Sequence, residues 1–139
     1  MEQTSLYNLN QWVKEDRIMV EDFNADNAKI EAALSGIPKI ATGTYTGKGT
    51  YGSSNKNSLT FDFQPAMVVI MRNGTNSIAA GTILLYGQTQ SAGTSAQYNA
   101  FSLELTVAWS GNTVTWYSGQ NADRQLNASG TYRYLALGI

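Results

Sequence analysis

No helical pattern occurs in the sequence after residue 36, and this restricts most strongly what the chain can fold into. Apolar and polar residues instead alternate over short segments, the pattern of half-buried β-strands. Turn-forming residues separate these segments, and strands spaced in this way are typical of an antiparallel sandwich. We therefore predict that residues 38–139 form a mainly β domain, an antiparallel β-sandwich of the jelly-roll or lectin-like kind, and exclude doubly wound α/β folds. The expected strands cover residues 59–64, 66–71, 78–86, 101–109, 113–117 and 131–137.

Two of these segments, residues 59–64 and 66–71, also indicate where their strands end or lie in the sheet. Residues 66–71 are apolar at every position, which indicates a central strand. Pro65 is expected to end the strand before it.

A two-residue hairpin loop at residues 111–112 gives a register that can be checked. It pairs Trp109 with Val114 and Val107 with Trp116. Paired residues share one face of a sheet, so all four turn inward together. We therefore predict that Trp109 and Trp116 are core residues and that Tyr117 points outward.

Residues 20–35 predict one helix. Acidic residues in its first half complement the helix dipole, alanines favour the conformation, and Gly36 with Pro38 ends it. Two interpretations of the apolar spacing are open: a short self-associating coiled coil whose Asn fixes the register, or an amphipathic helix packed on its own domain. A helix of this length is marginal alone, so it must pack on something. The candidate oligomerisation residues, which we call the seam, are Val20, Phe23, Asn27, Ile30 and Leu34.

Residues 1–19 show no clear periodicity. If this segment were free in solution, the large aromatic ring of Trp12 would be exposed to water, which is unfavourable. We expect this segment, which we call the arm, either to fold back or to bind a partner. More than half of the charged residues lie in residues 1–40. The chain therefore has two predicted parts: residues 1–37 as an anchoring arm and trimerisation helix, and residues 38–139 as the β domain.

Residues 47–52 read GKGTYG, which matches G-x-G-x-x-G, a pattern that lets a backbone approach a pyrophosphate. The pattern works where the glycines join a strand to a helix whose N-terminus holds the phosphates. Here a polar segment and then a strand follow. We expect these glycines to serve turns or the close approach of a strand to a neighbouring chain.

The composition excludes several kinds of chemistry. The chain has no cysteine and no histidine, so disulfides and Ser–His or Cys–His nucleophile pairs are impossible. A net charge of −1 gives no field that would hold nucleic acid. The apolar runs are too short to cross a bilayer, and the first residues lack the pattern of a secretion signal. We expect no cofactor, no metal, and neither a nucleic-acid nor a membrane partner.

Hydrolysis of a glycan usually needs two carboxylates on either side of one bond. The β domain offers Asp62, Glu104 and Asp123. The first two lie on outward faces of expected strands, and Asp123 is expected to pair with Arg124. We therefore predict that the protein is not an enzyme, with a polysaccharide depolymerase as a third alternative.

Binding a glycan requires less: an exposed aromatic face with planar amide, carboxylate or guanidinium partners. Two polar loops, residues 87–99 and 118–127, offer these side chains. The simpler alternative, that both are ordinary amide-rich loops, is open. The candidate ligand-binding residues are Tyr98, Tyr117, Asn121, Asp123, Arg124 and Gln125.

Three segments carry a resemblance to known proteins. The first, TSLYNLNQWVKEDRIMVEDFNADNAKIEAAL, is most telling at YNL and DFNADN. The second is IATGTYTGKGTYGSSNKNSLTFDFQP, and the third is LNASGTYRYLALG. They resemble the N-terminal portion, the start of the β-rich C-terminal domain and the closing strand of tail-fibre-type proteins from phages and prophages of Gram-positive, often gut-dwelling, bacteria.

The resemblance implies a homotrimer in the virion, made in the host bacterial cytoplasm. Residues 1–19 would attach to other virion proteins, the helix would be a trimerising stem, and the β domain would meet the host surface. Two functions are open: a receptor-binding tip for a host surface glycan or protein, and a purely structural component such as a head fibre, decoration or baseplate accessory protein.

Overall fold

The computed structural model describes residues 1–73, 80–95 and 102–138. The chain divides into two compact units, Met1–Ile37 and Pro38–Ile139. In the described residues, no helix has the length and apolarity that crossing a bilayer requires.

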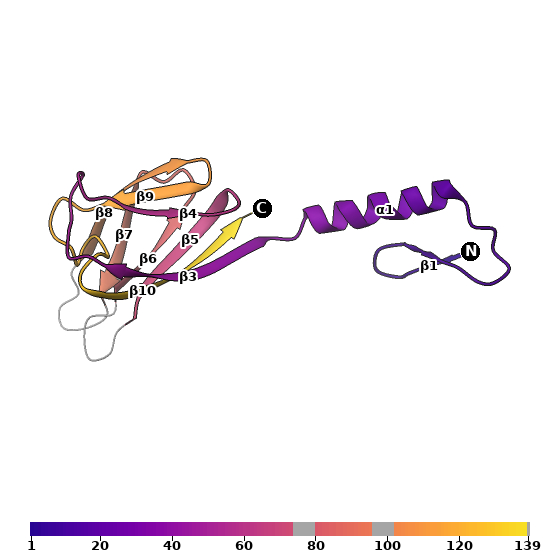
Figure 1. Cartoon of the computed structure of the whole chain (residues 1–139), viewed down its shortest axis with the longest axis horizontal. Helices are drawn as coiled ribbons and strands as arrows, with labels where there is room; N and C mark the ends of the chain where they lie inside the picture. The colour runs from indigo at the N-terminus through magenta and orange to yellow at the C-terminus, as the bar shows by residue number, and fades with distance from the viewer. Residues whose placement is uncertain (74–79, 96–101, 139) are drawn as a thin grey trace. The chain divides into compact units, whose positions relative to one another are not determined.

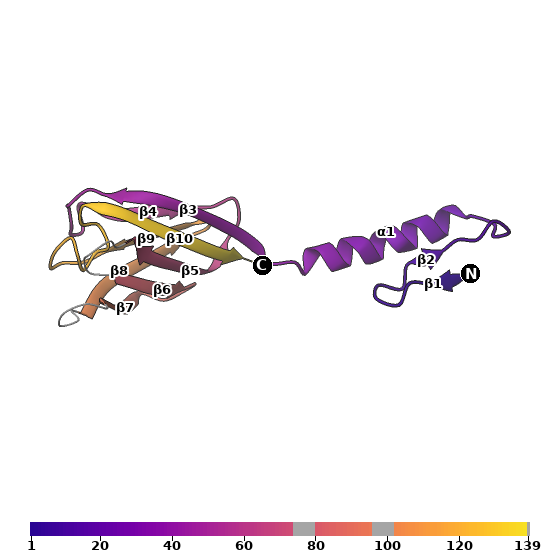
Figure 2. The ribbon, with the colours of Figure 1, turned by 90° about the horizontal axis from the view of Figure 1, so that it is seen from below.

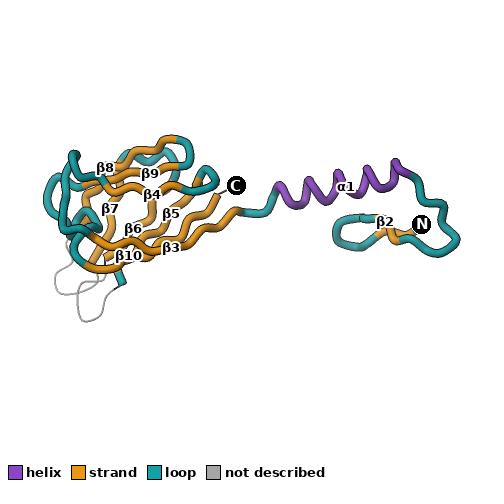
Figure 3. Tube along the Cα trace, in the orientation of Figure 1, coloured by secondary structure: helices purple, strands orange, loops and turns teal. Residues whose placement is uncertain are grey.

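The N-terminal unit consists of one helix and a small hairpin. The predicted helix is confirmed as α1 (Val20–Ser35), with Glu21 and Asp22 in its first turn. The arm forms β1 (Glu2–Gln3) and β2 (Asn10–Gln11), which pair antiparallel. Figure 3 shows this unit as a single coil of helix joined to a looped-back segment.

The arm folds back onto α1. The backbone N–H of Asn10 donates to Asp26 Oδ2 at 2.9 Å, and Lys29 Nζ donates to the carbonyl of Asn8 at 2.5 Å. The ring of Trp12 stacks on Phe23, with 5.8 Å between the centroids. Of the two expectations for the arm, folding back is therefore the one observed.

The arm covers only part of the seam of α1, where Trp12 stacks on Phe23 and Tyr7 and Leu9 line a shallow hollow with Ile30 and Leu34. The residues half-buried beneath the arm are Asp22, Asp26, Lys29 and Ala33. At about 100° per residue, the seam lies roughly a third of a turn away from them. Its apolar side chains are exposed, from 42% for Ile30 to 70% for Val20. Within residues 20–35, all of which the structure describes, no residue is buried.

The C-terminal unit is mainly β and antiparallel, which confirms the predicted fold class at that level. Its strands form one eight-stranded sheet with the order β3-β10-β5-β6-β7-β8-β9-β4. The strands are β3 (Lys39–Gly47), β4 (Asn57–Thr60), β5 (Pro65–Arg72), β6 (Ala80–Leu85), β7 (Gln90–Ser95), β8 (Ser102–Ser110), β9 (Thr113–Tyr117) and β10 (Gly130–Gly138).

The sheet curls so that its two halves face each other across one core (Figures 1 and 2). Rings from the two halves meet there: Tyr45 on β3 lies 6.0 Å from Trp116 on β9, centroid to centroid. A single curled sheet thus provides the two layers that two separate sheets provide in a sandwich. The most deeply buried apolar residues are Val68, Ile70, Leu84, Val114, Trp116, Leu126, Tyr132 and Ala136.

The predicted hairpin register is confirmed. Trp109 pairs with Val114 and Val107 with Trp116 across β8 and β9. Val107, Val114 and Trp116 are buried, and Trp109 packs against the core while partly exposed. Tyr117 lies at the end of β9, half-buried.

The apolar run at residues 66–71 lies in β5, between β10 and β6, so the predicted central strand is confirmed. Its burial alternates nevertheless. Val68 and Ile70 are fully buried in the core, whereas Met71 is exposed on the outer face.

The prediction that Pro65 ends a strand is wrong. β4 ends at Thr60, and Pro65 begins β5 instead of ending the strand before it. Between them the backbone N–H of Phe61 donates to the carbonyl of Asn112 at 3.0 Å, and the rings of Phe61 and Phe63 stack. Both rings belong to the hydrophobic core, so the alternation of apolar and polar residues here comes from buried loop residues and not from a strand.

The strand β7 falls in a segment that was expected to be a loop, residues 87–99. Apolar alternation is missing there because its inward residue Ser91 is polar. The Ser91 hydroxyl forms a buried 2.7 Å hydrogen bond with the hydroxyl of Thr82 on β6. This pairing satisfies both groups inside the core.

Stability should fall at alkaline pH because two tyrosines are stacked in the core. The rings of Tyr45 and Tyr132 lie 4.9 Å apart, and Tyr45 Oη donates to the carbonyl of Leu126 at 2.8 Å. Burial raises the pKa of both phenols above the ordinary 10.0. The unfolded chain loses these protons near pH 10 while the folded chain keeps them, so the free energy of unfolding decreases as the pH rises above about 10.

Thermal melts between about pH 9 and pH 11 measure this effect. We expect the decrease in Tm to be steeper in the wild type than in the Tyr45→Phe variant, which has one phenol fewer to ionise. Equal slopes would contradict this origin of the alkaline destabilisation.

Candidate functional site

Two loops cross the same end of the C-terminal unit. Residues 48–56 connect β3 to β4 at opposite edges of the sheet, and residues 118–129 connect β9 back to β10. Both crossings lie at the end away from the C-terminus (Figure 1). Long connections over one end of a β unit are common positions for binding residues.

Gln125 joins the two crossing loops from the inside. Its Oε1 accepts hydrogen bonds from the backbone N–H groups of Gly52, at 2.8 Å, and Ser118, at 3.0 Å. Its Nε2 donates to the carbonyl of Asn55 at 2.7 Å and to Oδ1 of Asn57 at 2.9 Å. The side chain is fully buried. The position expected for a ligand contact is therefore used to hold the loops together, which corrects the role predicted for Gln125.

Asn127 makes a second connection beside it. Its Oδ1 accepts from the backbone N–H of Lys48 at 3.1 Å, and its Nδ2 donates to the carbonyl of Thr50 at 2.8 Å. The carbonyl of Asn127 also accepts from the N–H of Gly49 at 2.6 Å. The sequence signal for both residues was their position among amides, which does not distinguish a buried amide from an exposed one.

The glycines of residues 47–52 serve this junction. Gly47 lies against the carbonyl of Ala128, so a side chain at that position would overlap the backbone. Gly49 and Gly52 have positive φ values of 73° and 93°, a region that favours glycine. The segment leads into β4 and no helix follows it within residues 48–60, as expected from the sequence.

The exposed part of the second loop carries the other candidate residues. Asn121 is exposed, and its Oδ1 accepts from the backbone N–H of Arg124 at 2.9 Å. The expected Asp123–Arg124 ion pair is not the one formed. Asp123 pairs with Arg72 of β5 at 3.0 Å, and Arg124 lies 3.8 Å from Glu104 of β8.

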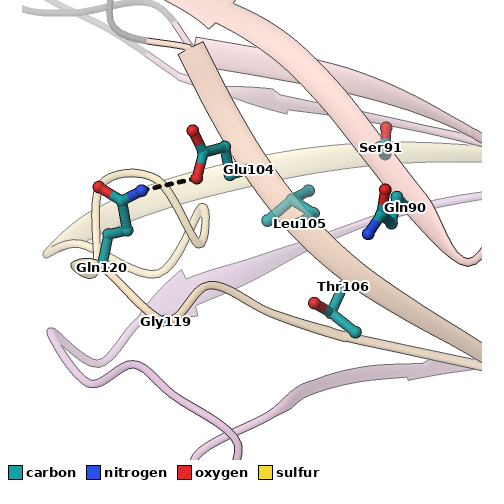
Figure 4. A pocket seen from close by; sticks show the side chains of 7 residues that line it. All are labelled: Gln90, Ser91, Glu104, Leu105, Thr106, Gly119 and Gln120. Carbon is teal, nitrogen blue, oxygen red and sulfur yellow. Dashed lines mark hydrogen bonds between the residues drawn. The ribbon is translucent and has the colours of Figure 1, made fainter.

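A polar depression of about 660 Å³ lies beside this loop (Figure 4). Glu104 is at its rim, where Gln120 Nε2 donates to Glu104 Oε2 at 2.6 Å. Gln90 and Thr106 are paired neighbours on β7 and β8. The remaining lining residues are Ser91, Leu105 and Gly119.

The register extends this surface toward Tyr117. Thr106 pairs with Gln90 on one side and with Tyr117 on the other, so the three side chains share one outer face. Lys56 lies 5.7 Å above the ring of Tyr117. An aromatic face, two amides, a hydroxyl, a carboxylate and a guanidinium thus surround one region, which suits a polar ligand with many hydroxyl groups. Gln90, Thr106 and Gln120 were not among the predicted site residues.

Tyr98, the remaining candidate, lies outside the described residues. In the part of the chain that the structure describes, no group of three or more Asp or Glu residues could hold a metal ion. The three carboxylates considered for hydrolysis have separate settings: Asp62 is exposed, Glu104 pairs with Arg124, and Asp123 pairs with Arg72.

Comparison with known proteins adds no identification, since no protein-family model, curated protein or solved structure matches the chain significantly.

Proposed function

We propose that the chain is a structural protein of a phage virion, a trimeric tail-fibre or receptor-binding tip that adheres to a glycan or protein on the host surface. The protein is made in the cytoplasm of the host bacterium and becomes part of the virion. Its C-terminal unit is a head of the jelly-roll or lectin-like sandwich class, and α1 is a coiled-coil stem.

The observation that carries the proposal is the exposed part of the seam of α1. An isolated helix of 16 residues is marginal in water, and the arm covers the seam only in part, chiefly through Trp12 on Phe23. Burying the exposed side chains of Phe23, Ile30 and Leu34 between copies would supply the missing packing, with Asn27 fixing the register. Repeated apolar positions at 3-4 spacing are the pattern that such an association requires.

The arm supports attachment to other virion proteins. Its polar contacts are made toward α1 through Asn8 and Asn10. Leu6 and Val13 remain exposed in the single chain. An apolar surface of this kind on a folded arm fits a protein partner better than water.

The polar depression supports recognition of a surface glycan. Sugar hydroxyls pair with planar amides, carboxylates and guanidinium groups, and sugar rings pack on aromatic faces. Gln90, Glu104, Gln120 and Arg124 provide the first kind of group, and Tyr117 provides the second. We propose this region as the receptor-binding surface.

A second function fits one observation: the charged groups near the loops already have partners within the chain. Glu104 accepts from Gln120 and Asp123 pairs with Arg72. A purely structural virion component, such as a head fibre, decoration or baseplate accessory protein, would need no free ligand groups. The third alternative, a polysaccharide depolymerase, predicts released oligosaccharides that disappear in the Glu104→Gln or Asp123→Asn variant.

Binding of the labelled full chain to a panel of Gram-positive gut bacteria and their cell-wall polysaccharides tests the proposal. We expect saturable binding to at least one host. The triple variant Gln90→Ala, Gln120→Ala, Arg124→Ala should bind at least about tenfold more weakly, because each group contacts the ligand directly. The Asp62→Asn variant, altered at an exposed carboxylate outside the depression, should bind like the wild type.

Two other outcomes of this experiment would contradict the proposal. Absence of binding across the panel, together with tight incorporation of the chain into phage particles, would support the structural function instead. Equal loss of binding in the triple variant and the Asp62→Asn variant would contradict the assignment of the depression.

A further inference from the structure

The outer face of one half of the sheet is mostly apolar, with Thr42 and Thr44 of β3 and Arg133 of β10 as its polar residues. In β10, Leu135 and Leu137 point away from the core, because Tyr134 and Ala136 between them point into it. The registers place Leu137 beside Ile40 of β3 and Met67 of β5, and place Met67 beside Leu85 of β6. The apolar side chains that share this surface, which we call the outer apolar face, are Ile40, Met67, Val69, Met71, Ile83, Leu85, Leu135 and Leu137.

Five of these eight side chains are exposed in the single chain, and Met67, Val69 and Leu137 are half-buried. Ile40 is 65% exposed and Ile83 is 54% exposed. Met71 lies flat across Gly81, since a side chain at Gly81 would overlap the Met71 sulfur. The apolar side chains are therefore neighbours across β10, β5 and β6, and Arg133 is the charged member of the paired rows.

The other half of the same sheet shows what a solvated outer face looks like in this fold. There Ala108 pairs with Thr115, which pairs with Ser58. Thr60 and Thr113 join their hydroxyls at 2.9 Å. The contrast between the halves is one of sequence and not of architecture, because both belong to one antiparallel sheet.

The apolar run in β5 points the same way. A strand that is apolar at every position is typical of one buried on both faces. In the single chain only the inner face, with Val68 and Ile70, is buried. The sequence of β5 therefore fits an assembly in which the outer face is covered as well.

We propose that the outer apolar face is a second interface between copies of this chain, through which the heads contact one another. The occupant is the same face of neighbouring copies. An apolar surface that holds one charged residue, Arg133, is largely self-complementary, with little charge repulsion between copies. The proposal rests on the self-association part of the proposed function and is independent of the receptor.

The outer apolar face is too small to hold copies together alone, so we expect it to act together with the stem. Four strands about 4.8 Å apart and three residue rows about 6.8 Å apart cover on the order of 400 Å². A stable interface buries roughly 800 Å² per partner. The face alone is therefore about half of what association requires, and the seam of α1 supplies a second contact.

Chain connectivity links the two contacts. α1 ends at Ser35 and β3 begins at Lys39, so a linker of at most about 14 Å separates them. Copies held together through α1 therefore keep their first head strands within a short distance. Such tethering raises the effective concentration of the outer apolar faces for one another.

Single thiols test the proposal directly, since the natural chain contains no cysteine. Three full-length variants are compared: Ile83→Cys in the outer apolar face, Ala108→Cys in the polar outer face and Asn27→Cys in the seam. The maleimide labelling rate of each folded variant is divided by the rate of the same variant unfolded in guanidinium. Sedimentation gives the mass of the same samples. We expect labelling of the Ile83→Cys and Asn27→Cys proteins to be at least tenfold slower than that of the Ala108→Cys protein, in samples that sediment as oligomers.

The other results separate the two contacts. Slow labelling at 83 with fast labelling at 27, in an oligomer, would keep the outer apolar face as an interface and overturn the stem. Slow labelling at position 27 with labelling at 83 as fast as at 108 would overturn the second interface and leave the stem intact. Slow labelling at 83 in a monomer would mean that this chain covers its own face, which also overturns the proposal. Fast labelling at 27 and 83 in a monomer would remove the self-association of the proposed function itself.

Discussion

Replacing Gln125 with alanine should lower the free energy of unfolding of the C-terminal unit by about 4 kcal/mol, because each buried polar group left without a partner costs roughly 1–3 kcal/mol. Four groups lose their partner in this variant: the N–H groups of Gly52 and Ser118, the carbonyl of Asn55 and the side-chain Oδ1 of Asn57. Water can reach part of the exposed loop, which keeps the total below the sum. Small domains are stable by only about 5–15 kcal/mol, so this single substitution removes a large fraction of the free energy of unfolding.

Chemical denaturation of the wild type and the variant measures the difference. Gln120→Ala is the matched control, because it removes the same side chain from the same loop at an exposed position. The side chain of Gln120 makes one exposed hydrogen bond, to Glu104, so the loss of this side chain should cost less than about 0.5 kcal/mol. Similar destabilisation in both variants would contradict the connecting role of Gln125.

The second large effect concerns assembly. The Ile30→Glu variant should be monomeric under conditions in which the wild type is assembled, because it places a charge at the centre of the apolar seam. Burying an unpaired carboxylate there costs more than the contact provides. We expect the association constant to fall by at least about a hundredfold, roughly 3 kcal/mol.

Ala32→Glu is the control for this variant. Position 32 is exposed on the side of α1 away from the seam, about 200° around the helix from position 30. The new residue is the same and favours helix at either position. Sedimentation should therefore show an assembled Ala32→Glu protein, and equal dissociation of both variants would argue against a seam-specific contact.

Local patterns predicted the parts of the fold that depend on neighbours in sequence. The bounds of α1 followed from its alanines, acidic first turn and terminal Gly36 and Pro38. The hairpin register followed from a two-residue turn and the alternation of Trp109 and Trp116. In both cases the interactions that decide the structure lie within a few residues of each other.

Other features depend on contacts between distant segments, and the sequence pattern could not predict them. Gln125 is buried because residues about 70 positions earlier provide its hydrogen-bond partners. Asp123 pairs with Arg72 because β10, which follows its loop, lies beside β5 in the sheet. The sequence pattern did not predict β7, because its inward residue Ser91 is polar and its hydroxyl is paired with that of Thr82 on another strand.

The candidate site was predicted in part for the same reason. The loop at residues 118–127 was identified by its amides and charges, and Tyr117 and Arg124 lie at or near the depression. Gln90 and Thr106 come from two other strands. Only the sheet register brings them to the same face as Tyr117.

The central claim is that copies of this chain assemble through exposed apolar surfaces that a single copy cannot bury. The mass of the wild-type full chain in solution, measured by sedimentation equilibrium at micromolar concentration, tests it most directly. The account predicts three times the 15.1 kDa of one chain. A protein that stays at 15.1 kDa over the whole concentration range would contradict it.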